Sequence, residues 1–448
     1  MQYILVQVLI SMCLIATTPR ALQSPVNLEI AHANRSIAPT ILNNNIALGW
    51  LDMLCDQIRF QRVGTPPASR AFGYFGLALH QSIVAGISNG VSLENQLIDL
   101  KNIPVPANNQ NYDWNIVLNN CEYIVCDEAL SRYMSPNSIG LISLRDKFNQ
   151  QLQQNTSYYI FTASKQLGES LGNAIVNYMK NDGYDYTREN NIYECPSRTG
   201  HPEWYEITDI DRSAYEPYWG TLRLLGSLPP DICSTNSATP FSLNPNSEFY
   251  KSAMKIVKVD TSLSQYNRVS ALYWQDNPIE TFTTPGHWMK IAKQQIVERN
   301  FNLAQTAEVL TYLGITLMNT SIITWKLKYK VNLLRPETYI HEVLNKPDWQ
   351  PYQESPPFPE YPSERASCAG AAAEVLTKYF GSTTFIDKTE MLIALKSRTY
   401  KSFKEAAEEA AWSSFYGGID FEAGIKDGLT IGNCIATHTI QTITLIHQ

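Results

Sequence analysis

The sequence predicts an all-α protein: a large helical bundle with one irregular, aromatic-rich insert at about residues 182–245. Apolar residues recur at helical spacing through most of the chain, and no alternating pattern typical of strands has any length. The insert is crowded with Tyr, Trp, Pro, Asn and Gly. An irregular segment this long is either an inserted surface lobe or a cover over a site. We expect one helical unit, with a division into two domains near residue 245 as the alternative.

The helical pattern can be followed along the chain in order. It runs over residues 38–90 with a break at Pro66-Pro67, then 113–135, 140–180, 247–277, 287–299, 302–330, 364–380, 403–416 and 421–445. The stretch from Ala68 to Ala85 is rich in small residues, which favour close helix packing. Ser402 and Glu405 predict a capping box at one helix start, and Gly417-Gly418 predicts the end of that helix.

Charge and hydropathy restrict the partners and the location. The 448-residue chain has a formal net charge of -7, which disfavours nucleic acid because phosphate contacts need a basic face. No polybasic run is present, and no segment after the N-terminus has the length of a membrane-spanning helix. Tyr3 to Ala16 is an apolar stretch of signal-peptide length. We therefore expect a signal peptide over residues 1–22 and a secreted mature chain, 23–448. The alternative is an apolar helix that belongs to the fold.

The cysteines indicate at most a few disulfides. Removal of a signal peptide would take Cys13 and leave seven of the eight cysteines, so at least one thiol stays free or pairs between chains. Cys195 and Cys233 lie in Pro-rich, loop-like sequence and are the candidate pair. No cysteine and histidine cluster has the spacing of a zinc site.

Lys328 and Arg335 form the first candidate site. They are seven residues apart, so on one helix they would point the same way, about 10 Å apart along the axis. Pro336 would then end or kink that helix. Two cations beside a loop with free backbone N–H groups suit a tetrahedral oxyanion.

Further motifs surround this pair in a distinctive order. They are Pro217 to Gly220, Trp274, Asp276, Pro285-Gly286-His287-Trp288, Pro362-Ser363-Glu364-Arg365, Gly370 to Leu376, Ser413-Ser414, and Tyr416 to Ile419. Together with Lys328 and Arg335, this order resembles the vanadium-dependent haloperoxidases and their type 2 phosphatidic acid phosphatase relatives. The resemblance spans about residues 45–440. It implies the helical bundle fold of that superfamily, in its larger, soluble, secreted branch.

The resemblance also implies roles for single residues. Lys328, Arg335 and Ser363 match positions that hold phosphate or vanadate. Glu364 stands where the family has a glycine, and Ser414 follows the matching Ser413 where the family has an arginine. The two family histidines are replaced: Arg365 takes the acid–base position, and Asp420 takes the position that bonds vanadium or attacks phosphorus. The implied oxyanion partner is phosphate or vanadate. We nevertheless expect no cofactor, because Asp420 stands at the position of the histidine that would bond vanadium.

These replacements predict a catalytically impaired protein with a remnant anion site. Asp420 would put negative charge beside an oxyanion, and Arg365 stays protonated and cannot shuttle a proton. The alternative is an active phosphohydrolase or haloperoxidase of altered mechanism. In its phosphatase form Asp420 is the nucleophile and Lys328, Arg335 and Arg365 hold the phosphate.

The charge swap predicts new contacts within the site. We expect Arg365 and Asp420 to pair across it, and Glu364 to face Lys328 or Arg335. Asp420 could instead, or in addition, cap the N-terminus of the last helix. The sequence predicts no oligomeric state.

Overall fold

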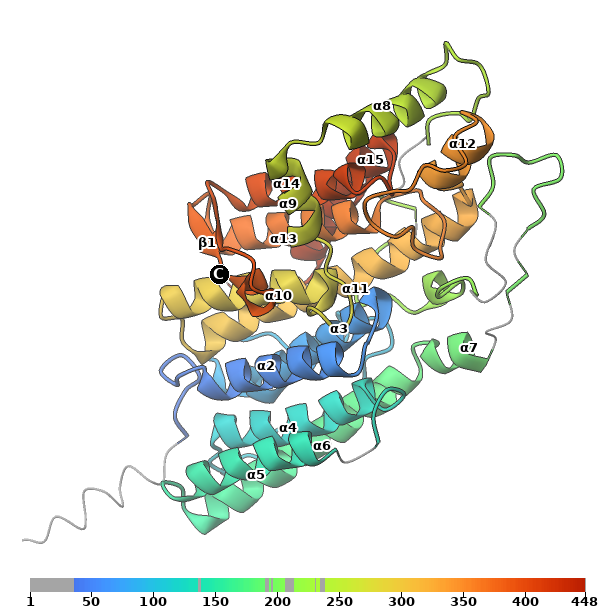
Figure 1. Ribbon diagram of the computed structural model, residues 1–448. Coiled ribbons are helices and arrows are strands. Elements are labelled where there is room, and N and C mark those ends of the chain that lie inside the picture. Colours follow the sequence, from blue (N-terminus) through green and yellow to red (C-terminus); the bar gives the residue numbers. More distant parts are fainter. Residues whose placement is uncertain are drawn as a thin grey trace, which may run out of the picture.

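The computed structural model describes residues 36–135, 138–189, 193–194, 196–205, 213–229, 231–233 and 238–447. Within these residues the chain is a stack of helices (Figure 1). The longer helices are α2 (Asn45–Phe60), α3 (Thr65–Ile83), α4 (Trp114–Ala129), α5 (Ile139–Gln153), α6 (Tyr158–Lys180), α8 (Glu248–Ser262), α9 (Gln265–Tyr273), α10 (Thr283–Glu298), α11 (Leu303–Val331), α13 (Glu364–Phe380), α14 (Phe403–Tyr416) and α15 (Glu422–Thr442). The all-α prediction is confirmed.

Short elements complete the described chain. They are the helices α7 (Tyr184–Glu189) and α12 (Pro336–Glu342), the 3₁₀ turns η1 (Val84–Gly86), η2 (Trp219–Thr221) and η3 (Thr389–Ile393), and the strands β1 (Phe385–Asp387) and β2 (Arg398–Tyr400). The two strands pair antiparallel. The hairpin was not predicted, because three residues per strand are too few to show an alternating pattern.

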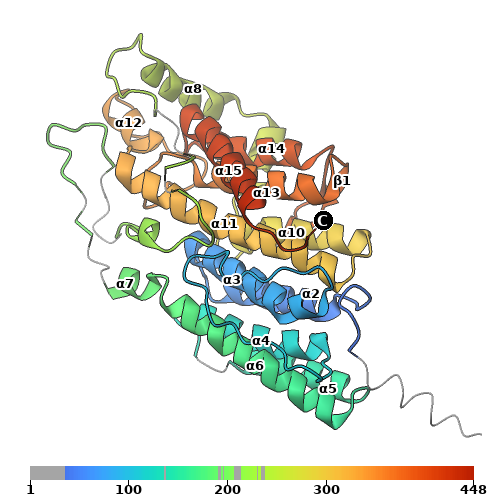
Figure 2. The same ribbon diagram turned by 180° about the vertical axis from the view of Figure 1, so that it is seen from behind.

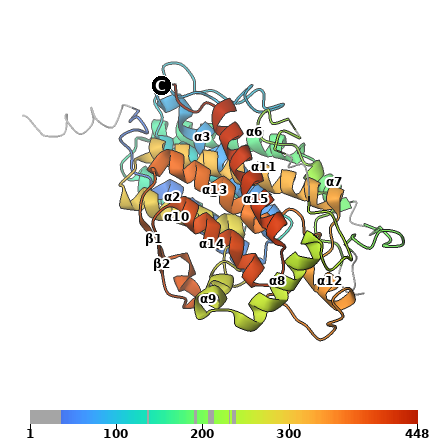
Figure 3. The same ribbon diagram turned by 90° about the horizontal axis from the view of Figure 1, so that it is seen from above.

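The long helix α11 lies in the middle of the stack. In Figure 1 the helices α2 and α3 lie on one side of it, with α4, α5 and α6 beyond them, and α13, α14 and α15 lie on the other side. Figure 2 shows the same order from behind, and Figure 3 shows α13 and α15 over α11 from above. Helix α11 packs against both α3 and α13.

The sequence of α11 explains its central place. Asn302 and Gln305 form a capping box that fixes its start. Most of its side chains up to Trp325 are buried, as expected of a helix covered on all sides. Even Asn319 is buried, and its amide hydrogen-bonds both the N–H and the carbonyl of Leu225. This asparagine lies in a glycosylation sequence but is not accessible for modification.

Small residues let the central helices approach closely. A Cβ on Gly76 of α3 would lie 2.8 Å from the Cα of Thr311 in α11. A Cβ on Gly370 of α13 would lie 2.5 Å from the Leu429 carbonyl oxygen of α15, and one on Gly428 would lie 2.7 Å from the Ser363 carbonyl oxygen. The close packing of α13 on α15 holds Ser363, at the start of α13, beside the start of α15.

The disulfide differs from the prediction. Cys233 pairs with Cys434 of α15, with the Cα atoms 5.7 Å apart. The expected pairing of Cys233 with Cys195 is therefore wrong, and Cys195 itself lies outside the described residues. A partner 201 positions away could not be found from local composition. The bond attaches the aromatic-rich insert to the last helix.

The N-terminal predictions are not tested by the structure. The signal peptide expected over residues 1–22 lies outside the described residues. In the part of the chain that is described, none of the helices combines the length and the apolar character needed to cross a membrane.

The close contact between α13 and α15 predicts the effect of one substitution. A Cβ at Gly432 would overlap the backbone carbonyl oxygen of Ser367, which cannot move without shifting α13. We expect Gly432→Ala to lower the free energy of unfolding by about 2 kcal/mol or more, measured by urea denaturation. Gly140→Ala is the control, because no atom lies closer than 3.5 Å to its added Cβ. Equal stability of the Gly432→Ala variant and the wild type would contradict this packing.

Candidate functional site

The motif residues converge on one cavity of about 510 Å³. Its walls come from the end of α11, the start of α12, the loop before α13, and the turn between α14 and α15. Ser213 and Tyr215 of the aromatic-rich insert also contribute, so the insert forms part of the wall. The charged residues in the lining are Arg62, Asp276, Lys328, Arg335, Glu354, Glu364, Arg365 and Asp420.

Lys328 donates its hydrogen bonds to backbone carbonyl groups. Its fully buried ammonium donates to the carbonyl oxygens of Pro359 at 3.1 Å, Glu360 at 2.9 Å and Pro362 at 2.7 Å. An ammonium has three N–H donors, so these carbonyls use all of them. Burial, together with repulsion from Arg335, lowers the pKa of Lys328 to about 7.

Arg335 is paired with the replaced position, Asp420. One terminal nitrogen of Arg335 donates to Asp420 Oδ1 at 2.7 Å and to the Ile419 carbonyl at 3.0 Å. Both side chains of the ion pair are almost completely buried. The remaining guanidinium nitrogens donate to the carbonyls of Phe358 and Pro359.

The Asp420 carboxylate binds Arg335 and Ser363, two residues that the resemblance assigns to oxyanion binding. Ser363 donates from Oγ to Asp420 Oδ2 at 2.7 Å, so both carboxylate oxygens are engaged. Burial alone would raise the pKa of Asp420, but the charges of Arg335 and Lys328 and the hydroxyls of Ser363 and Ser414 outweigh it and lower this pKa. Asp420 is thus an ionised carboxylate held where the family resemblance implies an oxyanion.

Glu360 is a buried acid that the sequence analysis missed. One of its carboxylate oxygens accepts from the Phe421 backbone N–H at 2.9 Å, and the other has no hydrogen-bond partner among the described residues. Burial and the charge of Asp420 raise the pKa of Glu360 to about 8. Its position two residues before Pro362, inside a Pro-rich loop, gave no sign of burial.

Arg365 does not form the ion pair with Asp420 that the sequence analysis predicted. Its guanidinium donates to Ser413 Oγ at 2.8 Å, to Gln353 Oε1 at 3.2 Å and to the Gln275 carbonyl at 3.3 Å. Among the described residues no ion pair joins it to an acid. The prediction failed because Arg335, which the pattern assigned to a free anion, takes Asp420 instead.

Three other predictions have different outcomes. Lys328 and Arg335 do not share a helix: α11 ends at Val331, Asn332 is left-handed (φ 52°), and Arg335 precedes α12 in extended conformation. Their side chains meet through the turn of the chain rather than through helical spacing. Asp420 does not cap α15, because the residue at the N-cap is Phe421. Ser402 does cap α14, accepting from the Glu405 N–H at 3.1 Å.

Glu364 lies at the cavity edge of this cluster. It lines the cavity and is partly buried. Burial raises its pKa to about 7, against the attraction of Arg365 and Lys328. It feels the charge of Lys328, as predicted, but makes no ion pair within the part of the chain that the structure describes.

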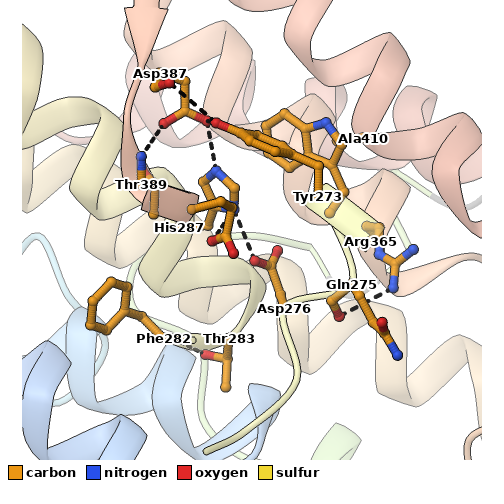
Figure 4. A network of polar contacts seen from close by, with 12 residues as sticks. Tyr273, Gln275, Asp276, Phe282, Thr283, His287, Arg365, Asp387, Thr389 and Ala410 are labelled. Atoms are coloured by element: carbon orange, nitrogen blue, oxygen red, sulfur yellow. Dashed lines mark hydrogen bonds and ion pairs between the residues drawn. The ribbon is translucent and has the colours of Figure 1, made fainter. Parts of the chain in front are cut away.

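A second buried polar cluster adjoins the cavity through Asp276. His287 lies between Asp276 and Asp387, with Nδ1 2.8 Å from Asp276 Oδ1 and Nε2 2.8 Å from Asp387 Oδ2 (Figure 4). Glu390 Oε1 lies 3.5 Å from the same Nδ1. Another histidine, His341, has its Nε2 2.6 Å from the Trp349 carbonyl oxygen.

The fold and the site define a helical protein built around a cavity with buried cations. Residues 308–448 match the family model for the VCPO second helical-bundle domain. No curated protein matches the chain in sequence. Among solved structures, a bacterial vanadium-dependent iodoperoxidase is similar, with 28% identity, a TM-score of 0.82, and coverage of 91% of this chain and 98% of that one.

Two structures of bacterial vanadium-dependent chloroperoxidase share the fold at lower identity. The holo form has 15% identity and a TM-score of 0.63, covering 93% of this chain and 97% of that chain. The apo form has 16% identity and a TM-score of 0.62, with coverages of 92% and 97%. The family-model match over residues 308–448 and the similarity to the iodoperoxidase structure support the vanadium haloperoxidase superfamily.

The residues present do not fit the vanadate that this superfamily implies. The metal-bonding position holds a carboxylate, Asp420, whose charge would repel an oxyanion. Lys328 has no donor left, and the Arg335 nitrogen that faces the site is bound to Asp420.

The ion pair of Arg335 and Asp420 predicts a stability effect that depends on pH. Asp420→Asn removes the countercharge of a buried guanidinium, and we expect the free energy of unfolding to fall by about 3 kcal/mol at neutral pH. Asp348→Asn, at an exposed position, should change it by less than about 0.5 kcal/mol. Urea denaturation measures both.

The sign of the pH dependence follows from the lowered pKa of Asp420. A carboxyl group with a lowered pKa stabilises the fold fully above its unfolded pKa of about 3.9, and this stabilisation is lost as the pH falls through the lower folded pKa. The stability gap between wild type and Asp420→Asn should therefore shrink below about pH 4. A gap that stays constant down to the acid limit of folding would contradict an ionised Asp420.

Proposed function

We propose that this chain is a catalytically impaired member of the superfamily that binds a small polar ligand in its cavity. One observation supports this most directly: the Asp420 carboxylate accepts from Arg335 and Ser363, the groups that would otherwise bind the oxyanion. A tethered carboxylate competes strongly with a dissolved anion, because it loses no translational freedom when it binds.

The chemistry of the lining supports binding rather than turnover. In place of the two family histidines the site has Arg365, which stays protonated at neutral pH, and Asp420, whose oxygens are both engaged. The cavity volume of about 510 Å³ is within the range of small-molecule sites. Its wall carries both positive and negative side chains, which suits a small molecule with donors and acceptors.

The altered-mechanism phosphatase has less support. An aspartyl nucleophile needs a carboxylate oxygen free to attack phosphorus, whereas Asp420 Oδ1 lies 2.7 Å from Arg335 and Oδ2 lies 2.7 Å from Ser363. The cations that would hold the phosphate are bound to backbone carbonyls and to Asp420 itself.

Titration with oxyanions tests the proposal. We expect no binding of phosphate or orthovanadate by the wild type in isothermal titration calorimetry at millimolar concentration, and no bromination of a dye with vanadate, peroxide and bromide. Asp420→Ser should gain oxyanion affinity by at least about tenfold, because it frees Arg335 and Ser363 while keeping a small polar side chain.

The matched control is Asp348→Asn, which should behave as the wild type. Bromide oxidation by the wild type at the rate of an ordinary haloperoxidase would contradict the proposal. Phosphatase activity that is abolished by Asp420→Asn would instead support the aspartyl mechanism.

We also propose that the chain is secreted. The apolar stretch from Tyr3 to Ala16 supports this, as does the disulfide of Cys233 and Cys434, because disulfides persist in oxidising compartments. Expression of the full chain in a secreting eukaryotic cell should give protein in the medium whose N-terminus, by mass spectrometry, begins near residue 23. Intact Met1 on protein that stays within the cell would contradict secretion.

A further inference from the structure

The cluster around His287 is rich in negative charge. Asp276, Asp387 and Glu390 surround the single imidazole, and all four side chains are at most 1% exposed. Three buried oxygens make no hydrogen bond within the described residues: both carboxylate oxygens of Glu390, and Oδ2 of Asp276. Buried acceptors without a partner are rare in folded proteins and call for an explanation.

The contacts of Asp387 fix the orientation of His287. Asp387 Oδ1 accepts from the Thr389 N–H at 2.9 Å, and Oδ2 accepts from the Tyr273 hydroxyl at 2.9 Å. Asp387 Oδ2 also lies 2.8 Å from His287 Nε2. With a hydrogen on Nε2, the imidazole donates to Asp387 and leaves Nδ1 directed at the other acids. The Trp274 ring stacks on the imidazole at 4.4 Å and restrains its tilt.

On the opposite edge of the imidazole, Nδ1 points towards two acids. Asp276 Oδ1 lies 2.8 Å from Nδ1, and Glu390 Oε1 lies 3.5 Å from it. The ligand atoms of these three residues all lie within 4.8 Å of one another. The 2.8 Å from Nδ1 to Asp276 Oδ1 is a hydrogen-bond distance, so either a proton on Nδ1 or a metal ion lies between the imidazole and these carboxylate oxygens.

The geometry suits a metal ion. Transition metals bind imidazole nitrogen and carboxylate oxygen at about 2.0–2.2 Å, which separates neighbouring ligand atoms by about 3–3.5 Å. Histidine ligands commonly donate their other ring N–H to a carboxylate, the arrangement that His287 and Asp387 show. We propose that Asp276, His287 and Glu390 form a binding site for a divalent first-row transition metal ion, such as Zn²⁺ or Mn²⁺, with Asp387 as the positioning residue.

The ion would lie at the wall of the cavity, because Asp276 lines it. This gives a route of entry from solvent past a single carboxylate. Arg365 is close enough to feel the charge of Asp276 but makes no ion pair with it within the described residues. The site is independent of the proposed loss of oxyanion binding, since it shares no residue with the cluster around Asp420.

Metal titration of the full chain tests the proposal. Protein treated with a chelator and then dialysed against Zn²⁺ or Mn²⁺ should retain one ion per chain by inductively coupled plasma mass spectrometry, and its melting temperature should rise. Glu390→Gln removes one ligand without changing the shape of the side chain, and we expect at least about tenfold weaker binding. Asp348→Asn, at an exposed acid outside the cavity, should bind as the wild type does.

Two results would overturn the metal site. One is wild-type protein that retains no stoichiometric ion, which means that protons alone hold the cluster together. The other is equal binding by wild type and Glu390→Gln, which puts the ion elsewhere. If Glu390→Gln fails to fold, wild-type crystals soaked in Mn²⁺ give the same decision: an anomalous peak beside His287 Nδ1 supports the site, and none there refutes it.

Discussion

The structure around the cavity depends on the compensation of four buried ionisable groups. Lys328, Arg335, Glu360 and Asp420 are each at most 4% exposed, and isolated charges at such depth would cost several kcal/mol each. The Asp420 carboxylate pairs with Arg335, backbone carbonyls accept from Lys328, and a pKa raised to about 8 keeps Glu360 largely protonated at neutral pH. The loop before α13 turns the carbonyls of residues 358–360 and 362 towards the cations. The end of α11 and the starts of α13 and α15 are thereby held together.

This balance explains how the fold can persist without a bound oxyanion. Two buried cations facing an empty site would repel each other, so either a bound anion or a side chain must neutralise them. Asp420 does so from within the chain, with Ser363 completing its hydrogen bonds. The same replacement that removes the vanadium ligand also removes the need for any external anion. Stability and the proposed loss of oxyanion chemistry therefore both rest on one residue.

The sequence predicted the helices well and the contacts of the site only in part. Helical spacing is local, so the starts of α13 and α14 were found to within a residue or two. The grouping of Lys328, Arg335, Ser363, Ser414 and Asp420 followed from the family resemblance; four of them line one cavity, and Ser363 donates to Asp420. The pairing of Cys233 with Cys434 and the burial of Glu360 depend on contacts between distant segments, which no local pattern carries.

Arg365 shows how a replaced catalytic position can acquire an electrostatic role. Burial lowers its pKa, while Asp276, Asp420 and Glu364 act in the opposite direction. Its hydrogen bonds go to neutral groups, Ser413, Gln353 and the Gln275 carbonyl. This one cation therefore attracts acids of both clusters without forming an ion pair with either among the described residues. A neutral histidine in this place would remove that attraction from Asp276 and Glu364, whereas Asp420 would keep its pairing with Arg335.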